Sequence, residues 1–195
     1  ENITEKVTVK QDLYQKMDEI CKPDTCFIAN TSCISITAIA AFTSRMDQVI
    51  GIHFMNPAAL KSTVELIAGV HTNQDTIQKA ERFLSELGKS FVSVGDFPGF
   101  VSNRISHLFM NEAAFAVQDR LAEPAQIDKI FRECFGHKLG PLETADLIGL
   151  DVVADSLDIL FESYHDSKYR CCPLLRKMVS AGMLGKKSGK GFYCY

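Results

Sequence analysis

Hydrophobic and polar positions follow two different patterns along this chain. In the first half, short apolar runs of strand type alternate with runs whose apolar residues recur every three or four positions. This alternation is typical of α/β structure. The pattern predicts strands at residues 25–29, 48–53, 63–67 and 90–94, and helices at residues 10–20, 35–42 and from Thr72-x-x-Asp75 to the closing Gly88.

Two of these helices have a recognisable apolar stripe. In the first, Leu13, Met17 and Ile20 fall at helical spacing, and we expect this face to be buried. In the third helix, the corresponding stripe consists of Ile77, Ala80, Phe83, Leu84 and Leu87. Both helices are therefore predicted to be amphipathic and to pack on the sheet.

The strand pattern stops at Pro98-Gly99, and the rest of the chain looks helical. Residues 101–121 have apolar side chains at helical spacing, and further helices are predicted at 124–135, 142–147, 151–164 and 173–179. We therefore predict an α/β domain over residues 1–98 and an all-α domain over residues 99–195.

Composition and charge exclude several functions. Of the 195 residues, 46% are hydrophobic and 23% are charged, and a net charge of −3 offers no broad cationic surface to nucleic acid. The longest nearly apolar run is 33–42, too short to span a membrane. Seven scattered cysteines, without a CxxC motif or a histidine at zinc spacing, indicate free thiols in a reducing compartment, which we take to be the cytoplasm, and no metal site.

One histidine and one glutamate have a spacing that suggests catalysis. A hairpin folded about residue 59 would place His53 at the end of one strand directly opposite Glu65 in the next. A carboxylate flanked by apolar residues needs a polar partner, and it would fix the orientation of the imidazole as a general base requires. The alternative is a structural histidine beside a glutamate that points to solvent from an edge strand.

Three further polar residues have a local interpretation and a functional one. Ser32 follows a predicted strand end, where open α/β sheets bind ligands, but on local grounds it is a helix N-cap. Asn56 before Pro57 is a turn signal first and a substrate contact second. Asn103 lies one turn into a helix, where a capping or solvated role is usual. The Gly185 to Gly191 segment does not have the spacing of a phosphate-binding loop.

Several motifs together resemble one enzyme family. They are HFMNP (53–57), TVE (63–65), FPGFVSNR (97–104), NEA (111–113), GPLETADLIGLD (140–151) and LGKKSGKGFY (184–193). In this order and spacing they are similar to the 3-hydroxyacyl-CoA dehydrogenase family. The resemblance implies the C-terminal part of a Rossmann-type NAD-binding domain, followed by a helical domain that forms a homodimer through residues 99–195.

The resemblance also implies a role for individual residues. His53 corresponds to the catalytic base and Glu65 to its partner, while Ser32 and Asn103 correspond to residues that hold the substrate oxygens. Glu5 and Lys10 match positions at the nicotinamide end of NAD, and we expect Asn30 and Ser32, in one motif, to contact the cofactor as well. The implied reaction is the reversible, NAD-dependent oxidation of a 3-hydroxyacyl-CoA to a 3-ketoacyl-CoA.

The chain departs from the family pattern in two ways. No GxGxxG motif occurs, so we expect an N-terminally truncated fragment that keeps only residues for the nicotinamide end of NAD, does not bind NAD measurably by itself and is inactive alone. Ala59 and Lys61-Ser62-Thr63 replace the family's usual residues near the substrate. The motifs at 140–151 and 172–179 look closest to members from polyketide pathways, so an acyl-carrier-protein thioester is an alternative substrate. A non-catalytic dimeric relative is the second alternative.

Overall fold

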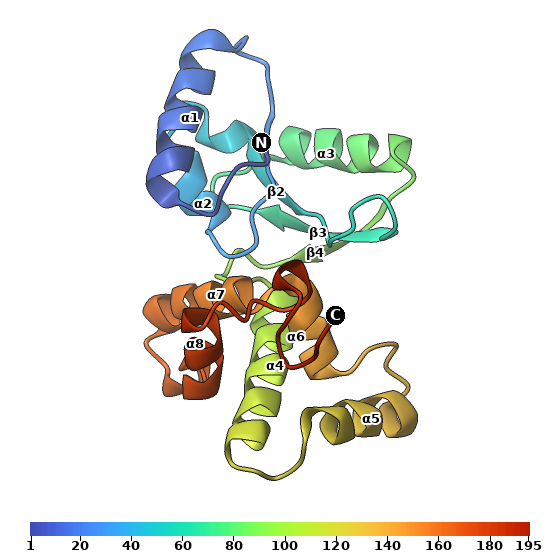
Figure 1. Ribbon diagram of the computed structural model, residues 1–195. Coiled ribbons are helices and arrows are strands. Elements are labelled where there is room, and N and C mark those ends of the chain that lie inside the picture. The colour runs from blue at the N-terminus through green and yellow to red at the C-terminus, as the bar shows by residue number, and fades with distance from the viewer. The chain divides into compact units, whose positions relative to one another are not determined.

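The computed structural model describes residues 1–195, and the chain divides into two compact units, Glu1–Val101 and Ser102–Tyr195 (Figure 1). Each unit has its own buried apolar core. The first unit contains a sheet with helices, and the second contains helices only. The predicted fold class, α/β followed by all-α, is therefore confirmed.

The first unit is built on a four-stranded mixed sheet with the order β1-β2-β3-β4. Its strands are β1 (Phe27–Ala29), β2 (Val49–His53), β3 (Thr63–Ala68) and β4 (Ser90–Val94). The pairs β1–β2 and β3–β4 are parallel, whereas β2 and β3 are antiparallel. All four predicted strands are present, although β1 is two residues shorter than expected. Because β3 lies between two neighbours, it is not an edge strand.

Helices cover both faces of this sheet (Figure 1). Helices α1 (Val7–Ile20) and α2 (Ile36–Ala40) pack in one apolar cluster with Val49, and α3 (Gln74–Glu86) packs in the other with Ile50. Val49 and Ile50 are consecutive on β2, so they point to opposite faces, as strand geometry requires. A short 3₁₀ turn, η1 (Met46–Gln48), leads into β2.

The buried face of helix α1 only partly matches the one its apolar residues predicted. Met17 packs against the core as expected, whereas Ile20 is 80% exposed, and Lys10 and Tyr14 are the fully buried side chains. Burial of Lys10 is tolerated because its Nζ lies 2.7 Å from Oε1 of Glu1, and the Tyr14 hydroxyl donates to Glu1 Oε2 at 3.2 Å. Burial and the neighbouring Glu1 carboxylate raise the pKa of Tyr14 above its ordinary value.

Helix α3 begins at Gln74, and its N-cap lies one residue later than predicted. Asn73, and not Thr72, is the N-cap residue, and its side chain accepts a hydrogen bond from Thr76 N at 2.8 Å. The Thr72 hydroxyl instead donates to Val49 O on β2. Of the expected stripe, Ala80 and Leu84 are buried, whereas Phe83 and Leu87 are partly exposed. Gly88 closes the helix with a positive φ of 66°, as predicted.

The second unit consists of five α-helices and two short 3₁₀ turns. They are α4 (Ser102–Gln118), α5 (Pro124–Phe135), α6 (Pro141–Ile148), α7 (Leu150–Tyr164), η2 (Ser167–Tyr169), α8 (Pro173–Ser180) and η3 (Lys186–Ser188). All the predicted helices are present. Helix α4 ends three residues before its predicted end, where Arg120 adopts a left-handed conformation with a φ of 58°.

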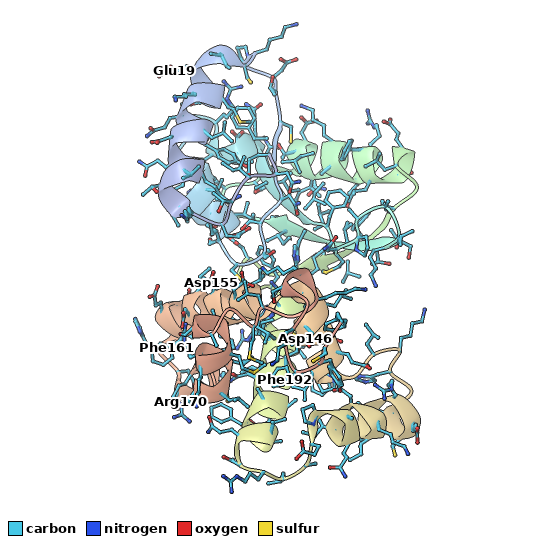
Figure 2. The ribbon with its side chains drawn as sticks, viewed as in Figure 1. Glu19, Asp146, Asp155, Phe161, Arg170 and Phe192 are labelled. Atoms are coloured by element: carbon cyan, nitrogen blue, oxygen red, sulfur yellow. The ribbon has the colours of Figure 1, made fainter.

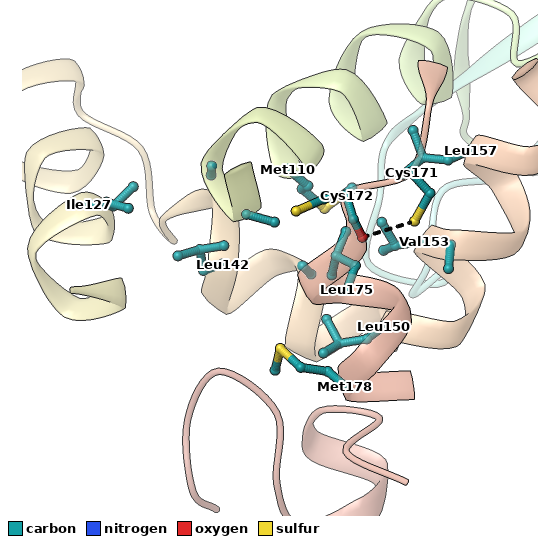
Figure 3. Packing of buried hydrophobic residues seen from close by; sticks show 14 residues of the cluster. Met110, Ile127, Leu142, Leu150, Val153, Leu157, Cys171, Cys172, Leu175 and Met178 are labelled. Carbon is teal, nitrogen blue, oxygen red and sulfur yellow. Dashed lines mark hydrogen bonds between the residues drawn. The ribbon is translucent and has the colours of Figure 1, made fainter. Parts of the chain in front are cut away.

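One apolar core holds these helices together (Figure 3). Met110 of α4, Leu142 of α6, Leu157 of α7 and Leu175 of α8 are all buried in it. Cys171 and Cys172 lie in the same core as free thiols. None of the helices combines the length and the apolar character needed to cross a membrane.

The C-terminal segment is fixed to α6 by one carboxylate. Asp146 accepts hydrogen bonds from the backbone N–H groups of Phe192 and Tyr193, both at 3.0 Å, and from the Tyr195 hydroxyl. Asp146 and Phe192 are labelled in Figure 2. A Cβ atom at Gly191 would overlap this carboxylate, so glycine is required at that position. Gly191 therefore has a structural role in this segment.

Candidate active site

The β2–β3 hairpin sets the geometry of the site. The register pairs His53 directly with Glu65, Ile52 with Leu66 and Gly51 with Ile67. The opposition of residues 53 and 65 predicted from their spacing is thus confirmed. Because side chains of directly opposed residues lie on the same face, the imidazole and the carboxylate point in the same direction.

His53 and Glu65 form a buried pair. Nδ1 of His53 lies 2.8 Å from Oε2 of Glu65, and the two residues are only 5% and 6% exposed. The other carboxylate oxygen, Oε1, accepts the backbone N–H of Val101 at 3.0 Å. The alternative of a solvent-exposed glutamate on an edge strand is excluded, because β3 is central and the carboxylate is buried and hydrogen-bonded.

Ser32 completes a chain of three side chains. Its Oγ lies 3.1 Å from Nε2 of His53, on the side of the ring away from Glu65. A carboxylate can only accept hydrogen bonds, so Nδ1 of a neutral imidazole donates to Glu65, and Nε2 is left to accept. Nε2 is therefore the ring atom able to take a proton from a bound hydroxyl.

The N-cap interpretation of Ser32 is wrong. Ser35 is the N-cap residue of α2, and its side chain accepts from Ala38 N. The backbone N–H of Ser32 donates instead to Oε1 of Glu5 at 3.0 Å, and Oε2 of Glu5 accepts from the Thr31 hydroxyl at 2.7 Å. Glu5 thus holds the loop after β1 in place and presents Ser32 to His53.

The other predicted site residues are distributed around this loop and beyond it. Asn30 bridges two segments: its Oδ1 accepts the backbone N–H of Phe54, and its Nδ2 donates to Asn2. Asn56 is exposed in the loop between β2 and β3, directly before a cis peptide bond. Lys10 is bound to Glu1. Asn103 lies in the first turn of α4, which belongs to the second unit.

A cleft of about 430 Å³ opens beside Asn30 in the first unit. It is lined by apolar and polar groups together, namely Glu1, Asn2, Ile28, Asn30, Phe54, Ala58 and Phe83. This size and mixed lining are typical of sites for small molecules and cofactors. The volume and the mixed polar and apolar lining leave room there for part of a dinucleotide.

Sequence reasoning missed three groups at this site. The Val101 N–H is a main-chain donor, so no residue type reveals it. Phe100 is buried, and its ring centroid lies 5.9 Å from that of His53. Asp96 lies two residues after the end of β4 and accepts four hydrogen bonds. A carboxylate at the end of a predicted strand is a signal that could have identified Asp96.

The order serine, histidine, carboxylate also occurs in hydrolases, and one contact argues against that chemistry here. A hydrolytic serine needs backbone N–H donors to stabilise the oxyanion that develops beside it. The Ser32 N–H is already bonded to the Glu5 carboxylate, which would repel such an anion. The arrangement favours proton transfer between His53 and a bound hydroxyl over nucleophilic attack by Ser32.

Comparison with known proteins identifies the family of this chain. Residues 1–97 match the family model described as 3-hydroxyacyl-CoA dehydrogenase, NAD binding domain, and residues 99–195 match 3-hydroxyacyl-CoA dehydrogenase, C-terminal domain. The chain is 46% identical to the probable 3-hydroxybutyryl-CoA dehydrogenase of Bacillus subtilis over 195 residues, 100% of this chain and 68% of that protein. It is 42% identical to the 3-hydroxybutyryl-CoA dehydrogenase of Bradyrhizobium diazoefficiens, covering 67% of that protein.

Solved structures give the same result. The crystal structure of M. tuberculosis FadB2 matches with a TM-score of 0.96 at 36% identity, over 100% of this chain and 69% of that one. The (S)-3-hydroxybutyryl-CoA dehydrogenase PaaH1 from Ralstonia eutropha matches with a TM-score of 0.95 at 41% identity, with the same coverage.

The two matching family models and the named relatives define an NAD-dependent oxidoreductase. Within that class, the chain belongs to the 3-hydroxyacyl-CoA dehydrogenase family. The activity and the cofactor that the sequence motifs implied, NAD-dependent oxidation of a 3-hydroxyacyl-CoA, are confirmed.

Proposed function

We propose that this protein oxidises a short-chain 3-hydroxyacyl-CoA, such as 3-hydroxybutyryl-CoA, and that His53 is the general base. The observation that carries the proposal is the buried chain from Ser32 Oγ through the His53 ring to Glu65, with contacts of 3.1 and 2.8 Å. Relatives named 3-hydroxybutyryl-CoA dehydrogenase, at 42% and 46% identity, support the choice of a short acyl group.

The proposed proton transfer uses Nε2 of His53. The C3 hydroxyl of the substrate approaches Nε2 beside Ser32, and its proton passes to the ring as the C3 hydrogen leaves with its electron pair. NAD, when bound, supplies the acceptor for that hydride. Glu65 then faces an imidazolium across a 2.8 Å contact and stabilises its charge. An imidazole suits a reversible reaction because its ordinary pKa is about 6.5.

Substrate and cofactor contacts are proposed for the remaining predicted residues. Ser32 and Asn103 would hold the substrate oxygens, and Asn56 would contact the substrate from the loop between β2 and β3. Glu5 and Asn30 would hold the nicotinamide end of NAD. Lys10 is buried against Glu1, which lines the cleft, so its contribution would be to fix that wall.

We assign the functions of the two domains accordingly. Residues 1–98 would form the cofactor-binding part and residues 99–195 the dimerisation part. The second unit exposes many large apolar side chains, which supports a homodimer formed there; examples are Ile105, Leu121, Ile130, Phe135, Leu147 and Val152. Light scattering would give twice the chain mass of 21.7 kDa for a dimer, and a value equal to the chain mass would contradict it.

The substrate proposal is tested by comparing thioesters in the whole protein. We expect NAD-dependent NADH formation from 3-hydroxybutyryl-CoA, with a higher kcat/KM than for the same acyl group on an acyl carrier protein. A preference for the carrier-protein thioester would replace our assignment by the polyketide alternative. Absence of NADH formation with either substrate would contradict the proposal as a whole.

The free thiols support a reducing compartment, and we propose the cytoplasm. No two of the seven cysteines are joined by a disulfide in the structure. Localisation of a tagged protein by cell fractionation would test this.

A further inference from the structure

The carboxylate of Asp96 accepts four hydrogen bonds from one short segment. Oδ1 accepts the backbone N–H of Ile36 at 2.7 Å, and Oδ2 accepts the backbone N–H of Thr37 at 2.8 Å. Oδ2 also accepts the hydroxyls of Thr37 at 2.6 Å and Ser35 at 2.9 Å. Asp96 lies two residues after the end of β4, about sixty positions along the chain from its partners, so it joins two distant segments.

Each of these segments contacts the His53–Glu65 pair from a different side. The segment that leads into α2 contains Ser32, whose hydroxyl meets Nε2 of His53. The segment that follows Asp96 contains Val101, whose N–H meets Oε1 of Glu65. Ser32 and Val101, which contact the two ends of the His53–Glu65 pair, therefore lie on two segments of the chain that Asp96 joins by hydrogen bonds.

The backbone after Asp96 is in a conformation that needs such support. Phe100 has a φ of 45°, in the left-handed region that a bulky residue rarely adopts, and Gly99 before it has a φ of 78°. The Phe100 ring is buried beside the His53 ring. Unfavourable backbone conformations of this kind persist only where the surrounding contacts fix them, and they are frequent at active sites.

We propose that Asp96 is a positioning residue for the proton relay. It holds the Ser32 loop and the turn at residues 97–101 at the spacing that keeps both ring nitrogens of His53 hydrogen-bonded. Asp96 does not touch the reacting atoms, and its effect passes through Ser32 and through the Val101–Glu65 contact. This inference rests on the proposed role of His53 as the base.

Asp96→Asn tests the proposal because the amide keeps the size of the side chain. All four partners of Asp96 are donors, so the NH₂ group of asparagine would face at least one donor and lose that hydrogen bond. The matched control is Asp18→Asn. Asp18 also accepts a backbone N–H, from Ser44, and a side-chain donor, from Arg45, and it has no contact with the relay.

Two measurements on the whole protein are needed. We expect Asp96→Asn to lower kcat about tenfold with a smaller change in KM, since displacements of about 1 Å can cost a hundredfold. Nitrogen-15 NMR of the labelled histidines reports the ring directly, and His53→Gln identifies the His53 signals. Wild-type protein and Asp18→Asn should show Nδ1 protonated and Nε2 unprotonated, whereas Asp96→Asn should show a mixture of tautomers.

The outcomes separate this inference from the proposed function. If Asp96→Asn leaves the ring signals and kcat equal to those of Asp18→Asn, the inference is wrong even when His53→Gln abolishes activity. If the ring signals change in Asp96→Asn while the wild-type protein does not oxidise 3-hydroxyacyl-CoA, positioning stands and the proposed function fails. Ser35→Ala removes one of the four bonds and serves if Asp96→Asn does not fold, with a smaller shift of the same signals expected.

Discussion

Val101 donates its backbone N–H to Glu65 at 3.0 Å, and this contact occupies the carboxylate oxygen that does not face His53. With both oxygens bonded in a buried site, the carboxylate has little freedom to rotate. A main-chain donor is well suited to this position because it has no side-chain rotamers of its own and cannot be protonated or ionised. The orientation of the imidazole is therefore fixed through two successive contacts.

Replacement of His53 should remove the base while leaving the cofactor region intact. We expect His53→Gln to lower kcat by at least about a hundredfold, because general bases contribute 10²–10⁴. NADH affinity, measured by fluorescence titration, should change little. His71→Gln is the control, since His71 is exposed, and it should retain wild-type turnover. More than a tenth of wild-type turnover in His53→Gln would remove His53 from the mechanism.

Glu65→Gln should damage the same step less severely. A glutamine oxygen can accept from either His53 or Val101, and its NH₂ group then faces the other donor, so one contact is lost. We expect turnover to fall about tenfold, because the base itself is still present. Steady-state kinetics against pH would measure this, and a loss larger than that of His53→Gln would contradict the assigned order of roles.

Thiol reactivity should follow burial. Cys134 and Cys194 are exposed, whereas Cys33, Cys171 and Cys172 are buried, and burial raises the pKa of Cys171 from its ordinary value of 9.0 to about 11. A thiol reagent at pH 8 should modify Cys134 and Cys194 first and Cys171 only after unfolding. Mass spectrometry of the modified peptides would identify the order. Early labelling of Cys171 would contradict the packing of the second core.

The same pKa shift sets a dependence of stability on pH. Between pH 9 and 11 the unfolded chain loses the Cys171 proton while the native state keeps it, so the native state binds more protons. The free energy of unfolding must therefore decrease as the pH rises through this range. Urea unfolding at several pH values should show a smaller decrease for Cys171→Ala than for the wild-type protein.

Lys89 should hold the loop between β2 and β3 in one conformation. Its Nζ donates to the carbonyl oxygens of Ala58 at 2.7 Å and Lys61 at 2.6 Å, which lie on either side of the turn. We expect Lys89→Met to increase hydrogen exchange of the amides at 58–61, because two carbonyl groups lose a charged donor. Lys79→Met, which removes only an exposed ion pair with Asp75, is the control and should leave this loop unchanged.

Most of the elements of the fold could be predicted, because periodicity and caps are local properties of the sequence. Residues 90–94 and 124–135 have the bounds that were expected. The burial of Lys10 on α1 could not be predicted, since it depends on an ion pair between Lys10 and Glu1 that forms only in the folded chain.

The candidate site was predictable to the extent that it depends on one hairpin. His53 and Glu65 are equally far from residue 59, so a symmetrical hairpin centred there pairs them, and this could be predicted from the sequence. The contacts of Val101 and Asp96 come from segments far apart in the sequence, and no spacing rule connects them with residues 65 or 36. Ser32 could be placed at a strand end, but its bond to His53 depends on the parallel pairing of β1 with β2.

The hairpin register has a consequence for how this site can diverge during evolution. The pairing of His53 with Glu65 is set by the ladder between β2 and β3, whereas the nine residues at 54–62 only connect the two strands. Insertions or substitutions in that connection leave the proton-transfer pair in place, while a single-residue insertion in either strand would turn one partner to the opposite face. Selection can therefore vary the surface around Asn56 for different acyl groups without rebuilding the acid–base chemistry.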